Sequence, residues 1–462
     1  MQARTLALAS SFIAIALAAV PTGAAAKVAV RDGAVPGYKA PGSPAKYNRV
    51  FVRKYGPSDA KKVLVLVPGT LAGASTFDIV APQLVEQVPS LQVWAQDRRE
   101  SALEDPSMLA KVRAGTATPA QARDYYLGWL ANPAITPHYQ PLTNAQTAFG
   151  KTWGLRVALE DLRRIVLRAS DGGKRTVVLG GHSLGGGIAT LYATWDFHGT
   201  PGYRDIDGIV GIDGGMSRSG GAITLAQAKA QLAELDTKGP WMDLLGLGLP
   251  WVAGAFGEVA AAAAYTDPKG ASVFDGFPLL PAQFKPPVPA TNQGGLGFAF
   301  DRKTSPAALS LIHVRSGSLS PTGPLHDWVD DGITPIRNLA TAFSNPKLTA
   351  ESWYFPSRLS LDARAARSQP GPAVSKLLGL RSTHLRDVDI PYFAFQAELS
   401  GREDGLAKGA RDFKKRSKIP SVKIVDRKAT YSHLDPLLAA AGKNELVSTL
   451  GPWLRAITPR GK

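Results

Sequence analysis

The sequence predicts an α/β protein, in which a mostly parallel sheet is flanked by helices and interrupted by a large insert. Three observations support this fold class. From residue 49 onward, short apolar runs alternate with helical segments, which favours a parallel sheet with crossover helices. A strand, a glycine-rich turn and a helix follow one another over residues 176–193. Finally, the long segment 217–387 separates two of the strand signals.

The elements are expected in a regular order along the chain. Residues 27–48 contain several prolines and glycines and are expected to form a loop. The run 62–67 reads KVLVLV, and its unbroken aliphatic character predicts a strand buried on both faces. An amphipathic helix is expected at 153–170, before the stop signal Asp171-Gly172-Gly173. The strands are expected at 49–53, 62–67, 91–95, 176–179, 206–212, 391–397 and 422–425.

Two segments interrupt the alternation of strands and helices. The first, 100–149, lies between a strand and its crossover helix, and the second, 217–387, contains an apolar, partly helical stretch at 241–265. We find neither internal repeats nor a low-complexity linker. The sequence therefore predicts a single core, formed by residues 27–216 and 388–462, with 217–387 as a cap or lid insert.

The N-terminus has the pattern of a secretory signal peptide. Arg4 precedes an apolar run at 6–20, and Ala24-Ala25-Ala26 stands before Lys27. A basic start, a short apolar centre and an A-x-A site are typical of such leaders. We expect residues 1–26 to be removed after Ala26 and the mature protein to be periplasmic or secreted.

Composition excludes several functional classes. The chain has no cysteine, which rules out a disulfide framework, a cysteine nucleophile, thiolate metal sites and iron–sulfur clusters. The histidines lack metal-ligand spacing, and no phosphate-binding glycine loop is present, so no metal or organic cofactor is implied.

The formal net charge is +16, but no nucleic-acid-binding motif accompanies it, so we expect no nucleic-acid partner. The densest basic run, 408–428, is expected to be an exposed helix leading into a strand, with contact to an anionic surface as the alternative. The sequence leaves the oligomeric state open.

The glycine-rich turn predicts a nucleophilic serine. Gly181-x-Ser183-x-Gly185 stands between an apolar strand and a helix, the context that a nucleophile elbow requires. In such a turn the serine backbone is strained, and the neighbouring chain approaches so closely that side chains two residues either side would clash. The arrangement exposes the hydroxyl at a helix N-terminus, where developing negative charge is favoured.

A serine nucleophile needs a base and a carboxylate. His433 follows the last expected strand and precedes the last helix, whereas His182 adjoins the serine and is expected to point away from it. The carboxylate should lie between the serine and His433 in the chain. Glu398 lies nearest the end of the 391–397 strand and is chosen, while Asp404 and Asp213 remain open. The oxyanion donors are expected to be the backbone N–H groups of Leu184, directly after the nucleophile, and Thr70, in the turn Pro68-Gly69-Thr70-Leu71.

Three elements in this order resemble the α/β-hydrolase superfamily: Val67-Pro68-Gly69-Thr70, Gly181-His182-Ser183-Leu184-Gly185-Gly186 and Ser432-His433-Leu434-Asp435-Pro436. The elbow resembles those of secreted bacterial lipases and esterases. The resemblance covers roughly residues 48–216 and 388–458. Pro68 stands where many members have histidine, and the strand expected to carry the acid lacks the usual Gly-x-x-Asp spacing. Serine at the nucleophile position argues against the dehalogenase and epoxide-hydrolase branches, which use aspartate.

The resemblance implies a serine hydrolase acting on carboxylic esters, small-molecule or lipid. The insert would lie over the site, and its aromatic residues are available to line a hydrophobic acyl pocket. An acyltransferase using the same residues with an alcohol acceptor is the alternative. A non-catalytic binding protein on the same scaffold is a third possibility, which the intact serine, histidine and glycines disfavour.

Overall fold

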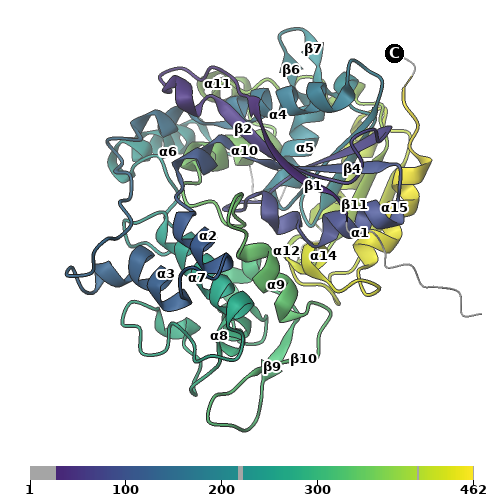
Figure 1. Ribbon diagram of the computed structural model, residues 1–462. Helices are drawn as coiled ribbons and strands as arrows, with labels where there is room; N and C mark the ends of the chain where they lie inside the picture. Colours follow the sequence, from purple (N-terminus) through teal and green to yellow (C-terminus); the bar gives the residue numbers. More distant parts are fainter. Residues whose placement is uncertain (1–27, 217–221, 403–404, 461–462) are drawn as a thin grey trace, which may run out of the picture.

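An eight-stranded sheet forms the centre of the computed structural model, which describes residues 28–216, 222–402 and 405–460. The strand order is β1-β2-β4-β3-β5-β8-β11-β12. β1 pairs antiparallel with β2 and β2 antiparallel with β4, whereas all further pairs are parallel. Helices flank the sheet and a helical insert extends from it (Figure 1), so the predicted fold class is confirmed. The predicted leader, 1–26, lies outside the described residues.

The strands of this sheet are β1 (Val30–Pro36), β2 (Arg49–Tyr55), β3 (Lys62–Val67), β4 (Leu91–Asp97), β5 (Thr176–His182), β8 (Gly208–Ile212), β11 (Tyr392–Gln396) and β12 (Val422–Asp426). Two short hairpins add β6 (Asp196–Phe197) with β7 (Thr200–Pro201), and β9 (Gly317–Leu319) with β10 (Trp328–Asp330). The α-helices are α1 (Val80–Gln87), α2 (Ser107–Arg113), α3 (Pro119–Tyr126), α4 (Leu155–Ser170), α5 (Leu184–Thr194), α6 (Leu225–Lys238), α7 (Val252–Thr266), α8 (Asn292–Phe300), α9 (Ile336–Phe343), α10 (Ser357–Arg367), α11 (Pro372–Leu378), α12 (Glu398–Gly401), α13 (Gly405–Arg416), α14 (Asp435–Leu438) and α15 (Glu445–Ala456).

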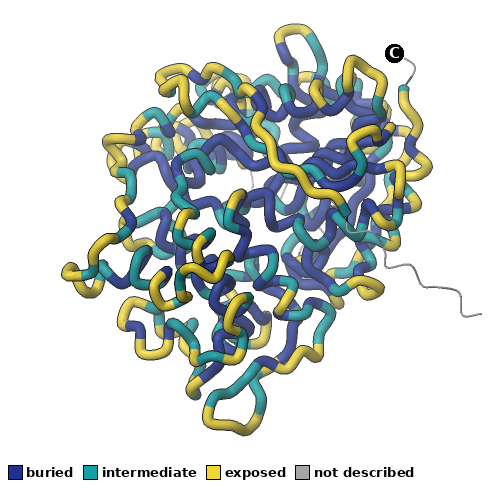
Figure 2. Tube along the Cα trace, viewed as in Figure 1, coloured by how far each residue is buried: buried dark blue, intermediate teal, exposed yellow. Residues whose placement is uncertain are grey.

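All seven predicted strands are present, each within three residues of its expected bounds. The prediction of a loop over 27–48 is wrong in part, because β1 lies inside it. β1 is an edge strand in which only Val35 is buried, and Figure 2 shows it exposed along most of its length. A strand that buries one side chain carries no alternation of apolar and polar residues, so nothing in its pattern distinguishes it from a loop.

Both faces of the sheet are covered, which explains the continuous apolar strands. On one face Leu64 and Leu66 of β3 pack into a core with residues of α1, α14 and α15. On the other face Val63 and Val65 pack into a core with residues of α4, α5 and α13. Because successive side chains of a strand point to opposite faces, KVLVLV contributes to both cores.

A second lobe extends from the sheet and combines two distant segments of the chain (Figure 1). Helices α2 and α3 come from the segment between β4 and α4, and both pack against α7, which in turn packs against α8 and α9. The aromatic side chains of both segments share one core, in which Tyr126 and Tyr139 contact Trp353 edge to face. The segment 217–387 also contributes to the other side of the molecule, because α10 packs against α4 and α5.

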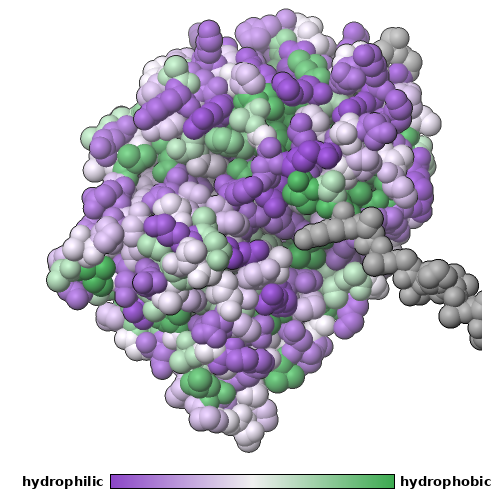
Figure 3. Space-filling view, viewed as in Figure 1, coloured by the Kyte–Doolittle hydropathy of each residue, from purple (hydrophilic) through white to green (hydrophobic). Residues whose placement is uncertain are grey.

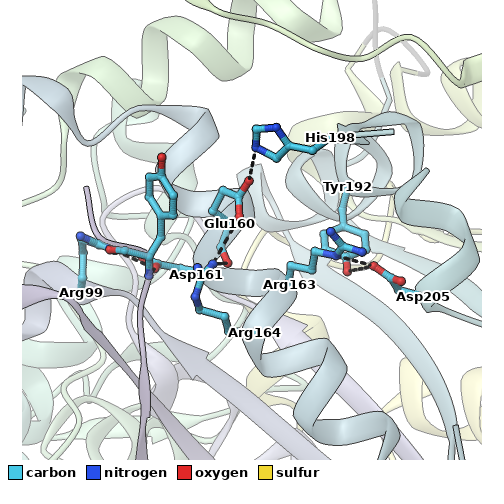
Figure 4. A network of polar contacts seen from close by, with 9 residues as sticks. Arg99, Glu160, Asp161, Arg163, Arg164, Tyr192, His198 and Asp205 are labelled. Atoms are coloured by element: carbon cyan, nitrogen blue, oxygen red, sulfur yellow. Dashed lines mark hydrogen bonds and ion pairs between the residues drawn. The ribbon is translucent and has the colours of Figure 1, made fainter. Parts of the chain in front are cut away.

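Charged contacts fasten α4 to its neighbours (Figure 4). Asp161 accepts two hydrogen bonds from the buried Arg99 guanidinium, at 2.6 and 2.7 Å, and a third from the backbone N–H of Tyr38. Two residues further along α4, Arg163 donates to Asp205, which also accepts from the hydroxyl of Tyr192, each at 2.9 Å. These contacts fix the helix that leads into the strand bearing the nucleophile elbow.

The surface is mixed in character. On the face shown in Figure 3, hydrophobic side chains gather in small patches among hydrophilic ones. Within the described residues, every helix is too short or too polar to cross a membrane. The basic run 408–428 forms α13 and β12, and Lys414 and Lys415 are exposed, as predicted.

Candidate active site

Ser183 occupies a sharp turn between β5 and α5. Its φ and ψ are 56° and −123°, a conformation that L-residues rarely adopt. The backbone N–H of Ser183 donates to the carbonyl of Ile212 at 2.9 Å, and its carbonyl accepts from Gly186 at 3.1 Å. The strained turn is therefore held by the adjacent strand and by the first turn of α5.

The glycines around Ser183 are required by close backbone contacts. A Cβ on Gly181 would lie 2.3 Å from the carbonyl carbon of Gly185, and one on Gly185 would lie 2.0 Å from the carbonyl oxygen of Val67. Neither glycine has a positive φ, so space alone excludes a side chain. The predicted reason for the glycine spacing is confirmed.

His433 and Asp213 form a buried hydrogen-bonded pair. The His433 Nδ1 lies 2.6 Å from Asp213 Oδ2, and both side chains are at most 2% exposed. A carboxylate only accepts, so Nδ1 carries the proton and Nε2 remains as the basic nitrogen. Ser183 and His433 line the same cavity.

Asp213 is held in its ionised form by its contacts. Its Oδ1 accepts from the backbone N–H groups of Ala397, at 2.8 Å, and Ser400, at 3.1 Å, and from the Ser400 hydroxyl. Burial acts to raise the pKa of Asp213, but the hydrogen bond and charge of His433, together with the Ser400 hydroxyl, bring it below its ordinary value. A carboxylate in this environment can orient an imidazole and stabilise its protonated form.

The choice of Glu398 as the partner of His433 is wrong. The Glu398 carboxylate accepts from Arg302, with both contacts at 3.1 Å, and from the Ser432 hydroxyl at 3.0 Å. Two cations of the insert, Arg302 and Arg315, draw it away from the imidazole. Asp213, an open alternative in the sequence, takes the position because β8 is hydrogen-bonded directly to β5. Asp404 lies outside the described residues.

The turn after β3 runs against the elbow and carries the second predicted donor. A Cβ on Gly69 would lie 3.0 Å from the Cβ of Ser183, and Thr70 and Leu71 both line the cavity beside it. Leu184 is the first residue of α5, whose initial backbone N–H groups have no partner within the helix. Leu184 thus adjoins Ser183 in the chain, and Thr70 follows Gly69, which packs against Ser183.

Arg98, which the sequence analysis did not single out, fixes this turn. Its buried guanidinium, 5% exposed, donates to the carbonyls of Pro68 and Gly69, each at 3.1 Å, and of Ala72 at 2.8 Å. Glu100 accepts from its Nε at 2.6 Å. Three carbonyls bound to one planar cation hold the turn in a single conformation. The sequence signal that could have identified Arg98 is the charged run Asp97-Arg98-Arg99-Glu100 at a strand end, because charged residues that are buried are usually paired with one another.

His182 supports His433 instead of pointing away from the site as expected. Its Nε2 lies 2.8 Å from the carbonyl oxygen of His433, and the two rings are 4.2 Å apart between centroids. Burial and the nearby His433 lower the pKa of His182 to about 3, so its imidazole stays neutral and donates this bond.

The site opens into a cavity of about 490 Å³. One wall carries Ser183, His433 and the turn after β3, and the opposite wall comes from the second lobe. That wall is formed mainly by apolar side chains of α7, α8 and the loop between them, including Phe256, Phe274, Leu296 and Phe300. Among the described residues, no group of three or more histidine, aspartate or glutamate side chains could hold a metal ion.

Comparisons with known proteins identify the fold. No protein-family model and no curated protein matches the chain in sequence. In structure it is similar to a lipase candidate from Sulfolobus solfataricus, with 16% sequence identity, a TM-score of 0.50, and coverage of 93% of this chain and 94% of that one. It also matches an epoxide hydrolase from an endophytic Streptomyces, with 12% sequence identity, a TM-score of 0.42, and coverage of 93% of this chain and 96% of that one. A third match is a monoglyceride lipase from Saccharomyces cerevisiae, with 11% sequence identity, a TM-score of 0.39, and coverage of 89% of this chain and 92% of that one. The first likeness shows that the chain has the α/β-hydrolase fold.

Proposed function

We propose that this protein is a serine hydrolase that cleaves hydrophobic carboxylic esters through an acyl-enzyme. The observation that carries the proposal is the buried 2.6 Å bond between His433 and Asp213, beside a strained Ser183 in the same cavity. A serine on a tight turn, a histidine with one nitrogen fixed by a carboxylate, and a turn with free N–H groups form the arrangement that acyl transfer needs.

The residues divide the chemistry as follows. The Ser183 hydroxyl attacks the ester carbonyl while Nε2 of His433 takes its proton. The negative charge on the former carbonyl oxygen is stabilised by the N–H groups of Leu184 and Thr70. His433 then protonates the leaving alcohol, which departs and leaves the acyl group on Ser183. Water, deprotonated by the same nitrogen, hydrolyses this acyl-enzyme, and Asp213 stabilises the imidazolium in both halves.

Hydrophobic esters are favoured by the character of the cavity. Its wall opposite Ser183 is mainly aromatic and aliphatic, and its volume suits an acyl chain better than a folded peptide. Polar side chains are few in this lining, so a charged or strongly polar acyl group would recover little of the hydration that it loses there.

The experiment is a comparison of p-nitrophenyl esters of increasing chain length with the wild type and with Ser183→Ala. We expect wild-type turnover with a preference for longer chains, and a loss of at least about a thousandfold in the variant. A serine-reactive phosphonate should label Ser183 and abolish turnover. Failure of both turnover and labelling would refute the proposal. Added alcohol distinguishes the acyltransferase alternative, because a transferase would yield a new ester in place of free acid.

The leader remains a prediction. N-terminal sequencing of protein exported by a bacterial host tests it, and we expect a mature chain that begins at Lys27.

A further inference from the structure

Two loops of the insert border the mouth of the cavity beside Ser183. Asp275 and Lys285, in the loop between α7 and α8, line the cavity and are exposed, so the cavity reaches solvent there. The loop before α7, residues 244–250, lines the same cavity with partly exposed side chains. Apolar side chains of both loops pack into one core, which holds the loops together.

Both loops contain a long stretch without charge. Residues 244–250 and 276–284 include no charged side chain, although charged residues make up 19% of the chain. We call these two stretches the rim. Because a charged side chain pays a large cost when its hydration is removed, a rim without charges can be covered by an apolar surface at little cost.

Leu247 is displayed by a turn that its neighbours build. It stands between Gly246 and Gly248, whose φ values of 69° and 73° are adopted by glycine without strain. The Asp243 carboxylate accepts from the backbone N–H groups of these two glycines, at 3.0 and 2.6 Å. The turn leaves Leu247 55% exposed, the highest fraction for a large hydrophobic side chain in the part of the chain that the structure describes.

Leu279 occupies the corresponding position on the other stretch of the rim. It is 38% exposed and directly precedes Leu280, which lines the cavity. Single exposed leucines are common on soluble proteins and need no explanation. These two differ from such cases because each lies on an uncharged loop at the opening of an apolar cavity.

A lipid surface fits the rim better than a second protein molecule. A stable dimer buries about 1,200 Å² or more, and two leucine side chains on separate turns supply a small part of that area. A hydrocarbon layer needs no matching surface, since each apolar side chain that enters it gains the transfer free energy of its own area. The rim is also continuous with the apolar lining of the cavity.

We infer that the rim, residues 244–250 and 276–284, docks on the surface of aggregated lipid, with Leu247 and Leu279 in the hydrocarbon layer. An ester molecule then passes from the lipid into the cavity without crossing water. This inference rests on the proposed ester hydrolysis where it names water-insoluble lipid esters as the substrate class, whereas docking itself needs no turnover.

The test measures binding of protein exported by a bacterial host to phosphatidylcholine vesicles, by flotation. Ser183→Ala is used so that no ester is cleaved. These vesicles have no net charge, which keeps the net charge of +16 from contributing. We expect binding that persists in about 0.5 M salt. Leu247→Ser should lower the partition coefficient about tenfold, and the double variant with Leu279→Ser should lower it about thirtyfold or more.

The chain offers matched controls for both leucines. Leu167 on α4 is 47% exposed and Leu225 on α6 is 37% exposed, and neither helix lines the cavity. Leu167→Ser and Leu225→Ser remove the same apolar area away from the rim and should leave the partition coefficient within about twofold of its original value.

Turnover gives a second readout in protein with Ser183 intact. On an emulsion of a long-chain triglyceride at subsaturating concentration, Leu247→Ser should lose about the same factor in rate as in vesicle binding. Its kcat for dissolved p-nitrophenyl acetate should stay unchanged, because Leu247 does not line the cavity.

The outcomes separate this inference from the proposed function. Absence of vesicle binding, or binding that survives the loss of both leucines, would overturn the docking surface even if dissolved esters are hydrolysed. Binding that requires anionic vesicles and disappears in salt would assign docking to the net charge instead of the rim. A dimer in light scattering that Leu247→Ser dissociates would assign the rim to a second copy of the chain. Vesicle binding without turnover of any ester would refute only the proposed function.

Discussion

Replacing Asp213 by asparagine tests the site most directly, because the surrounding hydrogen bonds fix how the new amide must lie. Oδ1 of Asp213 accepts from two backbone N–H groups, those of Ala397 and Ser400, and from the Ser400 hydroxyl. An asparagine must direct its oxygen to these donors, since its NH₂ group would face them without accepting. The NH₂ group is then turned towards Nδ1 of His433, where Oδ2 now lies at 2.6 Å.

The loss of activity follows from this orientation. Facing an N–H donor, Nδ1 of His433 must become the acceptor, and the ring proton moves to Nε2. An Nε2 that already carries its proton cannot take the one from Ser183. The corresponding change in serine proteases lowers kcat by about 10⁴, which corresponds to about 5 kcal/mol of lost transition-state stabilisation. We expect a loss of similar size in kcat, with KM changed much less.

The assay is steady-state hydrolysis of the best p-nitrophenyl ester, with Glu398→Gln as the matched control. Glu398 is 24% exposed and bound to Arg302 and Ser432, so its neutralisation should change kcat by less than about threefold. Circular dichroism and thermal unfolding check that both variants fold. If Asp213→Asn kept a tenth or more of the wild-type kcat, or if Glu398→Gln lost as much as Asp213→Asn, the assignment of the acid would be wrong.

Three further predictions concern positioning, stability and the elbow. Arg98→Lys should lower kcat about tenfold to a hundredfold with little change in KM, because an ammonium lacks the planar fork that holds the three carbonyls of the oxyanion turn. Burial raises the pKa of Asp97 to about 7 and of Glu351 to about 8. Around neutral pH the folded chain therefore holds protons that the unfolded chain has lost. The free energy of unfolding, measured by urea titration, should fall as pH rises from about 6.5 to about 8.5. Gly185→Ala places a Cβ 2.0 Å from a backbone oxygen and should cost more than about 3 kcal/mol of stability in thermal unfolding.

Each of these has an outcome that would contradict it. An Arg98→Lys variant with raised KM and unchanged kcat would place the guanidinium in substrate binding and not in holding the turn. A urea midpoint that rises or stays constant over that pH range would show that Asp97 and Glu351 titrate normally. Gly33→Ala is the control for the glycine, because a Cβ there meets nothing within 4 Å; equal effects of the two substitutions would refute the steric argument.

Neighbouring residues in the chain were sufficient to predict the elbow, the position of His433 and the buried strands. The elbow at Ser183 and the position of His433 after the last strand were identified because strand, turn and helix signals lie side by side in the chain. The buried strands were predicted for the same reason: burial on both faces leaves an unbroken apolar run.

The acid could not be chosen from the sequence, because its identity depends on contacts between distant segments. Asp213 and Glu398 both follow strands whose ends lie near the site. What separates them is that Arg302 and Arg315, far away in the insert, bind Glu398. Likewise, nothing in the residues around Glu351 indicates that its side chain meets α7 in a cavity.

The two-segment construction of the second lobe limits how it can move. A lid attached through one pair of connections can swing about a single hinge axis. Here the chain passes between the sheet and the lobe four times, near residues 98–107, 150–155, 239–252 and 345–357. The two segments of the lobe share the core that contains Tyr126 and Trp353. A rigid swing would have to bend four linkers about a common axis, one of which is fastened by Arg98 to the turn beside Ser183. Under the proposed function, we therefore expect substrate to enter through rearrangement of the loops at the cavity mouth, with the lobe as a wall that moves little.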